Sequence, residues 1–257
     1  MKIVVAVKQV PSRDSQLRVG ASAKWIDEAD LTYEINEPDA YALESGLQLK
    51  EKLSGEVVVL CAGPERASQT IREALAKGAD RAIHIETNQS ASSDPLALAR
   101  MMAKALDFEK PDLILTGLQS DDLGYGQTGV ILAELLGVPH ATIVMQVDKT
   151  DSGIRVKREL EDGWFQHVDM PLPALLTIQS GISKLRYATL MGIKKAKTKE
   201  VRRVTAESLG VAAAASGMTL ERIYLPERSK HTQLFEGSPK EAAAKLVEKL
   251  KFEARVI

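Results

Sequence analysis

An α/β fold with a doubly wound, mostly parallel sheet is what this 257-residue sequence predicts, together with a β-hairpin section and an extended C-terminal arm. Short apolar runs of the kind that forms strands buried on both faces recur at residues 3–7, 57–61, 82–85 and 113–115. Segments with helical spacing of apolar residues lie between them. This alternation is typical of a parallel sheet covered by helices on both faces.

The expected helices are marked by apolar positions three or four residues apart and by residues suited to helix starts. Pro38 and Pro95 stand where proline is tolerated in a first turn, and Asp94 is placed to cap the helix that follows it. The apolar stripes are Ala40, Leu43 and Leu47; Ile71 and Leu75; Leu98, Met102 and Leu106; and Ile131 and Leu135.

The chain changes character after Pro139. Residues 154–159 and 164–170 flank a turn at residues 161–163 and predict a β-hairpin, and residues 174–178 predict a further strand. From about Thr198 the core signals weaken, and an amphipathic helix over residues 239–250 needs a surface to lie against. We therefore expect an α/β core at residues 1–183, a loop at 184–200 and an arm at 201–257.

The composition is that of a globular protein, with 44% hydrophobic and 27% charged residues and a net charge of −1, which indicates no particular partner. The single cysteine, Cys61, excludes an internal disulfide and a cysteine-based metal cluster made by this chain alone. A reducing cytoplasm is the expected location. We expect a soluble chain without membrane insertion, because neither a secretory h-region nor a run of membrane-spanning length occurs.

A glycine-bearing loop follows the fourth predicted strand. It runs from Gly117 to Thr128, where a sheet's crevice and the start of a following helix can bind a phosphate. Gln119, Ser120, Gln127 and Thr128 could hold that phosphate by neutral hydrogen bonds. From these residues alone, a mononucleotide site and a simple helix cap are evenly matched.

The stretch from Gly124 to Gly129 also matches G-x-G-x-x-G, and Asp148 lies near the expected ribose position. The match is weak support for NAD, because the fingerprint belongs to the first strand and helix of such folds. The lysine of the Walker motif is absent from the loop, so nucleotide triphosphate hydrolysis has no support.

No set of residues predicts a reaction or a metal site. His84, His140, His167 and His231 show no spacing typical of metal ligands. Cys61 ends an apolar strand, and a small buried residue is expected there. Glu159 and Glu161 flank a turn, where charges are usually exposed.

A basic stretch provides a different signal. Residues 184–203 contain eight lysines and arginines but only one acid, Glu200, beside the apolar Leu190. A solvated face is the default interpretation. Nucleic acid is disfavoured, because Tyr187 is the only aromatic residue in the stretch. A partner protein with acidic groups fits better, since complementary charge around an apolar anchor guides transient encounters.

At these residues the chain resembles the β subunit of electron transfer flavoproteins. The likeness runs nearly end to end, and the motifs that carry it lie at residues 3–8, 76–82, 117–128, 156–160 and 186–190. The resemblance implies an adenine nucleotide α-hydrolase-like fold and an electron carrier subunit without catalytic residues of its own. It implies AMP as the cofactor of this subunit, FAD held mainly by an α subunit, and an arm that packs on that α subunit.

The resemblance also assigns roles to residues. It makes Leu190 the anchor of a recognition loop for dehydrogenases, with Tyr187, Lys194 and Lys195 beside it, and it pairs Glu159 with an arginine of the α subunit. The implied AMP-binding residues are Ala6, Asn36, Ala62, Gly117, Gln119, Ser120, Asp121, Gly124, Gly126, Gln127 and Thr128.

The implied partners are the α subunit, acyl-CoA or other flavin dehydrogenases, and a quinone oxidoreductase downstream, which places the chain in electron transport and fatty acid oxidation. Many relatives have a tyrosine and a phenylalanine where this chain has Arg13 and Pro38. Direct contact between this subunit and the flavin is therefore not expected. The alternatives are an electron-bifurcating subunit with a second FAD, which Tyr125 disfavours, a stand-alone nucleotide-binding regulatory domain, and an NAD-dependent enzyme.

Overall fold

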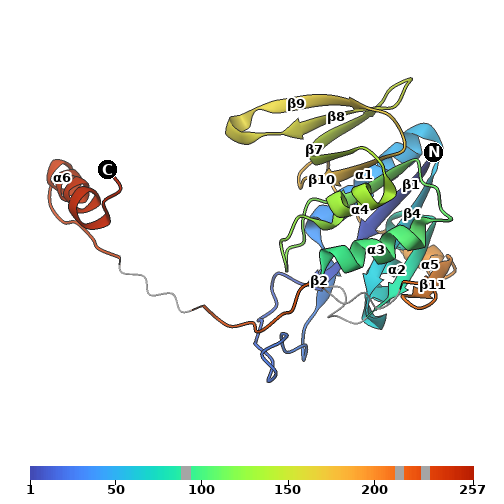
Figure 1. Ribbon diagram of the computed structural model, residues 1–257, viewed down its shortest axis with the longest axis horizontal. Helices are drawn as coiled ribbons and strands as arrows, with labels where there is room; N and C mark the ends of the chain where they lie inside the picture. The colour runs from blue at the N-terminus through green and yellow to red at the C-terminus, as the bar shows by residue number, and fades with distance from the viewer. Residues whose placement is uncertain (88–93, 212–216, 227–231) are drawn as a thin grey trace.

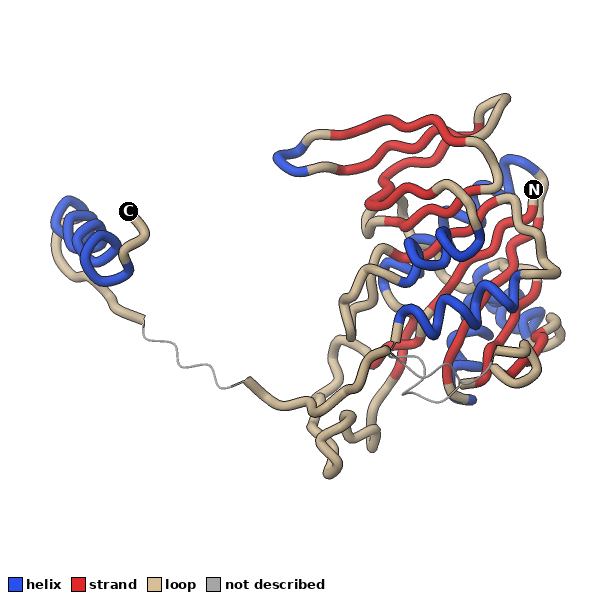
Figure 2. The backbone as a smooth tube through the Cα atoms, viewed as in Figure 1, coloured by secondary structure: helices blue, strands red, loops and turns tan. Residues whose placement is uncertain are grey.

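The computed structural model describes residues 1–87, 94–211, 217–226 and 232–257. Its centre is a nine-stranded sheet in the order β11-β5-β4-β1-β6-β10-β7-β8-β9, as Figure 1 and Figure 2 show. The six strands from β11 to β10 are parallel, and the order reverses beside β1. The parallel strands are β1 (Lys2–Val7), β4 (Glu56–Gly63), β5 (Arg81–Glu86), β6 (Leu113–Gly117), β10 (Ala174–Ile178) and β11 (Val201–Thr205).

Helices cover both faces of this sheet, which confirms the doubly wound α/β fold. Alternate residues of β1, such as Val4 and Val5, enter two separate apolar cores because successive side chains of a strand point to opposite faces. One face carries α1 (Glu37–Leu53) and α2 (Ser68–Lys77), and the other carries α3 (Pro95–Leu106) and α4 (Thr128–Leu136).

The helix starts follow the sequence signals. Pro38 lies in the first turn of α1, and Asp94 caps α3 by accepting hydrogen bonds from the backbone N–H groups of Leu96 and Ala97 at 2.8 and 3.3 Å. The sequence did not predict the two-stranded ribbon of β2 (Gln9–Pro11) and β3 (Tyr33–Ile35), because both strands are only three residues long.

The sheet continues beyond β10 with β7, which pairs with β10 in parallel, and then with two antiparallel strands. β7 (His140–Lys149) bends at a register shift, and the expected hairpin forms as β8 (Ile154–Glu159) and β9 (Phe165–Met170). Ile143 at the bend has a φ of 57°, which is unusual for a β-branched residue. Its backbone N–H donates to Thr177 Oγ1, and Arg158 donates to both oxygens of Thr142. The bend directs the hairpin away from the parallel sheet (Figure 1).

The C-terminal part differs from the expected division at residue 201. β11 pairs with β5 and so belongs to the main sheet, whereas we expected the arm to begin at this point. Residues 217–226 then run alongside a loop from the N-terminal part of the chain. The Ile223 N–H donates to the Ala23 carbonyl of that loop at 2.7 Å.

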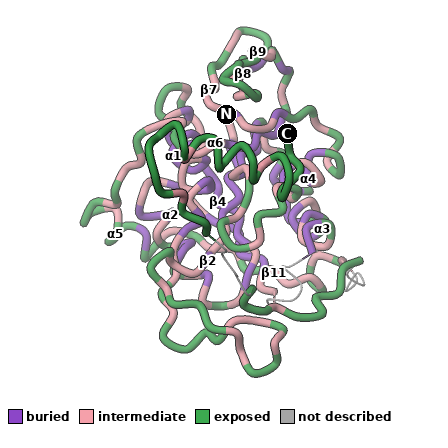
Figure 3. Tube along the Cα trace, turned by 90° about the vertical axis from the view of Figure 1, so that its left-hand side faces the viewer, coloured by how far each residue is buried: buried purple, intermediate pink, exposed green. Residues whose placement is uncertain are grey.

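The expected isolated helix is α6 (Pro239–Lys249), capped by Ser238 and Glu241 and followed by a π-helical turn (Leu250–Ala254). It stands apart from the sheet, and none of its residues is buried (Figure 1 and Figure 3). Among the described residues, no helix is both long and apolar enough to cross a membrane.

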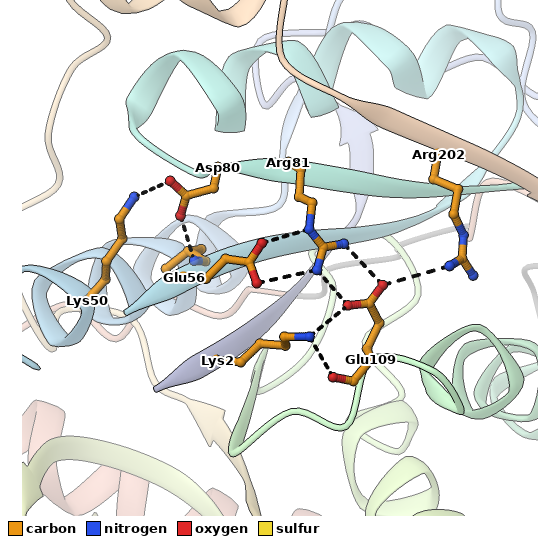
Figure 4. A network of polar contacts seen from close by, with 8 residues as sticks. Lys2, Lys50, Glu56, Asp80, Arg81, Glu109 and Arg202 are labelled. Atoms are coloured by element: carbon orange, nitrogen blue, oxygen red, sulfur yellow. Dashed lines mark hydrogen bonds and ion pairs between the residues drawn. The ribbon is translucent and has the colours of Figure 1, made fainter. Parts of the chain in front are cut away.

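A charged cluster joins the strands near their amino ends. Glu109 is nearly buried and accepts hydrogen bonds from Arg81 at 2.6 and 3.1 Å, while Lys2 and Arg202 approach the same carboxylate (Figure 4). The segment after α3 is thereby tied to three strands, β1, β5 and β11.

Candidate functional site: a cleft at the switch point

A cleft opens at the carboxyl ends of β1 and β6, where the strand order reverses. This is the place where open α/β sheets bind ligands. Residues 6–8 at the end of β1 and residues 116–120 at the end of β6 form two walls, and residues 125–129 at the start of α4 form a third.

Asp39 joins the two strands beneath the cleft. Its carboxylate accepts the backbone N–H of Lys8 at 2.8 Å and that of Gly117 at 2.9 Å. Burial raises the pKa of Asp39 to about 7, although the two N–H donors favour the charged form. Gly117 has no space for a Cβ, because the backbone and side chain of Asp39 occupy that position. The ends of β1 and β6 are therefore held at a set separation.

Asn36 shapes the glycine-bearing loop from the other side. Its side-chain amide donates to the Gln119 carbonyl at 2.9 Å, and its Oδ1 accepts the Asp121 N–H at 2.8 Å. Gly124 and Gly126 have φ values of 64° and 63°, which glycine adopts without strain. A buried amide and two glycine turns thus define the path of this loop.

One end of the cleft suits an anion. α4 begins here, and its N-cap residue Gln127 makes no side-chain hydrogen bond to the first turn, so backbone N–H groups remain for a ligand. Lys8 lines the cleft as well, at the end of β1, with its Nζ 2.6 Å from Asp122 and 3.3 Å from Ser120. Gly129 allows α4 to lie against Thr116 and Thr177, where a Cβ would overlap both side chains.

A second region of the cleft is apolar. Pro95, Leu98 and Met102 of α3 line it, together with Ala6 and Ala62 from the strand ends. A flat, weakly polar group such as a nucleobase could lie between these side chains, while a phosphate would reach the α4 end. The cleft therefore combines the two environments that a mononucleotide requires.

The described residues do not form a set suited to acid–base or nucleophilic catalysis in this cleft. Burial raises the pKa of Cys61 to about 12, so its thiol stays protonated. Glu65, His84 and Glu86 each bring one potential metal ligand atom within 4.8 Å of the others. Arg203 already bridges the two carboxylates, at 2.9 Å from Glu65 and 2.7 Å from Glu86, and supplies the positive charge there.

The basic stretch forms a second surface, away from the cleft. Thr189 caps the short helix α5 (Leu190–Ala196) by accepting the Gly192 N–H at 3.0 Å. Tyr187 is 92% exposed and Leu190 is 88% exposed, and Lys194 and Lys195 are exposed beside them. The large side chains of Tyr187 and Leu190 therefore have no packing role within the described chain. We call residues 184–197 the docking segment.

Glu159 lies elsewhere, at the end of β8, half-buried, where its carboxylate accepts a hydrogen bond from Gln179 at 3.4 Å. β8 lies next to one edge of the sheet, whereas α5 packs on α2 near the other edge (Figure 1), so the predicted partner-binding residues belong to two surfaces. The side chain of Asp148 contacts Gln146 on exposed β7, and this residue does not line the cleft, as the NAD interpretation would require.

All the residues predicted to bind the nucleotide line the cleft except Asp121 and Gly124, which shape its loop. Sequence reasoning missed Lys8 and Asp39, together with the apolar wall of α3. Lys8 directly follows a strand, and Asp39 lies three residues after Asn36, so position alone could have indicated them. The α3 residues were identified only as a helix stripe.

Comparisons with known proteins support the same family. An electron transfer flavoprotein domain model matches residues 24–209. The β subunit of Methylophilus methylotrophus is 38% identical over 96% of this chain and 97% of its own length. This chain belongs to the electron transfer flavoprotein β-subunit family. The β subunit of Mus musculus and the mitochondrial β subunit of Arabidopsis thaliana are each 35% identical over all of this chain, covering 99% and 100% of their own lengths.

Proposed function

We propose that this chain is the AMP-binding, non-catalytic β subunit of a heterodimeric electron transfer flavoprotein. The observation that carries the proposal is the cleft, whose lining combines apolar side chains with a lysine and an uncapped helix start. A family whose members carry electrons needs no acid–base set in this subunit. AMP bound here would stabilise the fold and supply no redox chemistry.

Different residues of the cleft would bind the base and the phosphate of the nucleotide. Leu98 and Met102 would cover the base, the first N–H groups of α4 would bind the phosphate, and Lys8 would balance its charge. Asn36 would orient the loop through its two backbone contacts. Tyr125 lies on the cleft wall, where a larger dinucleotide would need space, and this supports AMP over a second FAD.

Two surfaces would serve protein partners. The docking segment would bind acyl-CoA or other flavin dehydrogenases through Leu190, with the lysines accelerating the encounter. The apolar side of α6 would lie on the α subunit, which holds the FAD, because this helix has no surface of its own chain against it. Electrons would leave through a quinone oxidoreductase.

The docking role is tested with Leu190→Ala in the heterodimer. Truncating a central apolar anchor typically costs about 2 kcal/mol or more, so the half-saturating dehydrogenase concentration should rise at least tenfold. Flavin content and heterodimer assembly should not change. Phe108→Ala, another exposed apolar residue, is the control. Transfer kinetics equal to those of the wild type would remove Leu190 from this role.

A further inference from the structure

The docking segment is attached to the core by a charged contact that lies beneath its exposed residues. Arg186 donates from Nε and Nη2 to Glu44 at 2.8 and 3.0 Å, and from Nη1 and Nη2 to Glu51 at 2.6 and 3.2 Å. Both glutamates belong to α1. The guanidinium therefore uses all three of its nitrogens inward, while its neighbour Tyr187 points into solvent.

Glu44 makes this contact unusual. Its side chain is only 5% exposed, and it accepts the Arg186 backbone N–H as well, at 3.3 Å. A buried carboxylate that lacks a cation is costly, and the fork of an arginine fits it with directional hydrogen bonds. The pair thus sets both the position and the direction of the chain just before Tyr187.

The other end of the docking segment is attached independently. Arg72 of α2 donates to the carbonyls of Ala196 and Lys199 at 2.6 and 3.1 Å. Gly192 lies so close to the Ala76 carbonyl that a Cβ has no space. α5 therefore lies directly on α2, and Arg186 restrains the three residues that lead into it.

We propose that Arg186 is a positioning residue for docking, which holds the segment in its binding-ready form through Glu44 and Glu51. The proposal rests on the docking function proposed above. Only the molecules whose docking segment has the binding-competent conformation can bind a partner, so the apparent affinity falls with the fraction of such molecules. A preformed segment keeps this fraction high and avoids the cost of ordering the loop on binding. Arg186 acts through Leu190 and Tyr187 and makes no contact with the dehydrogenase itself.

The test compares Arg186→Gln, Arg186→Lys and Glu44→Gln in the intact heterodimer. Flavin reduction by an acyl-CoA dehydrogenase is followed as a function of dehydrogenase concentration. If the competent fraction falls to about a tenth, the half-saturating concentration rises about tenfold while the limiting rate is unchanged. Arg186→Lys should recover part of the affinity, because lysine keeps the charge but loses the fork.

Glu44→Gln discriminates positioning from contact. Its buried side chain cannot reach a partner, so an effect as large as that of Arg186→Gln supports positioning, together with faster amide hydrogen exchange at residues 190–197. Arg100→Gln, at an exposed arginine of α3, is the matched control. The proposal would be overturned if Arg186→Gln and Glu44→Gln both kept wild-type affinity and wild-type amide exchange. It would also be overturned if Arg186→Gln bound weakly and Glu44→Gln did not, because that result would indicate direct contact. An unaffected Leu190→Ala would instead overturn the docking function.

Discussion

Asp39 and Lys8 are the charged residues on which the cleft depends. Asp39 satisfies two backbone N–H groups at the switch point, and in the proposed function Lys8 would supply positive charge to the phosphate. The two are linked, because the N–H that Asp39 accepts belongs to Lys8. A change at Lys8 should therefore affect nucleotide binding directly, and a change at Asp39 should affect it through the positions of the strand ends.

Asp39→Asn should change how stability depends on pH. The pKa of Asp39 is raised to about 7 by burial, whereas in the unfolded chain it returns to about 4. Between about pH 4 and about pH 7 the Asp39 carboxyl keeps its proton in the folded state but loses it in the unfolded chain. The wild type should therefore lose stability relative to the variant as the pH rises from about 4 to about 7. The effect is about 1.4 kcal/mol per pKa unit of difference.

Thermal unfolding midpoints at pH 5, 6, 7 and 8 measure this effect. Asp169→Asn is the control, because Arg155 lowers the pKa of this exposed carboxylate and its contribution is lost only as the pH falls. A difference between wild type and Asp39→Asn that stays constant with pH would contradict the account.

Lys8→Gln should weaken AMP binding by about tenfold, as expected when a hydrogen bond to a charged group is lost. The measurement is the AMP retained by the heterodimer after extended dialysis. Lys104→Gln removes an exposed lysine that pairs with Asp107 on α3 and should retain AMP like the wild type. Equal retention in the two variants would place the phosphate elsewhere.

Among the elements, α4 determines where the part of the cleft that suits an anion lies. The position of its first turn depends on the close contact of Gly129 with Thr116 and Thr177. The sequence predicted α4, the four-residue-spaced stripes and the buried parallel strands, because periodicity records burial directly. It did not predict β11 as part of the sheet. The alternation of apolar and polar residues is too weak at Val201, Arg202 and Arg203 to identify an edge strand. Tertiary contacts decide that this strand pairs with β5.

The cleft illustrates the same limit. Glycines and polar residues of the 117–128 loop were recognisable, but the positions that α3 contributes from another part of the chain were not. Met102 reads as an ordinary core residue in a helical stripe. Only the packing of α3 beside α4 turns Pro95, Leu98 and Met102 toward the loop.

Gly129→Ala should displace α4, since the added Cβ overlaps Thr116 Oγ1 and Thr177 Cγ2. Overpacking of this kind typically costs about 1–3 kcal/mol. We expect a lower unfolding midpoint and less bound AMP. Adding Thr177→Ser removes the overlapping methyl group and should recover part of both, and an unchanged midpoint in Gly129→Ala would show that α4 does not depend on this contact.

Across the whole molecule, the charged cluster of Figure 4 joins the strands from β1 to the edge strand β11 and ties them to the segment before β6. Glu109→Gln leaves Arg81, Lys2 and Arg202 close together without their common carboxylate, and should destabilise the fold by about 2 kcal/mol or more. Urea unfolding measures this loss. Asp107→Asn, an exposed neighbour, should change stability by less than about 1 kcal/mol, and equal effects would contradict the role of the cluster.

The two ends of the molecule have different tasks in this account. In the proposed function the sheet would hold a nucleotide at its switch point, while the exposed apolar side chains of the docking segment and α6 would contact other proteins. The purified chain alone should therefore show no flavin absorbance, and the flavin should appear only when the α subunit is co-expressed.

The nucleotide content of that heterodimer tests the central claim most directly. The complex is purified, denatured and its released cofactors are separated and quantified. The account predicts one AMP and one FAD per heterodimer, with less AMP and an unchanged amount of FAD in Lys8→Gln. Two FAD and no AMP would contradict it and would indicate a cleft that holds a second flavin.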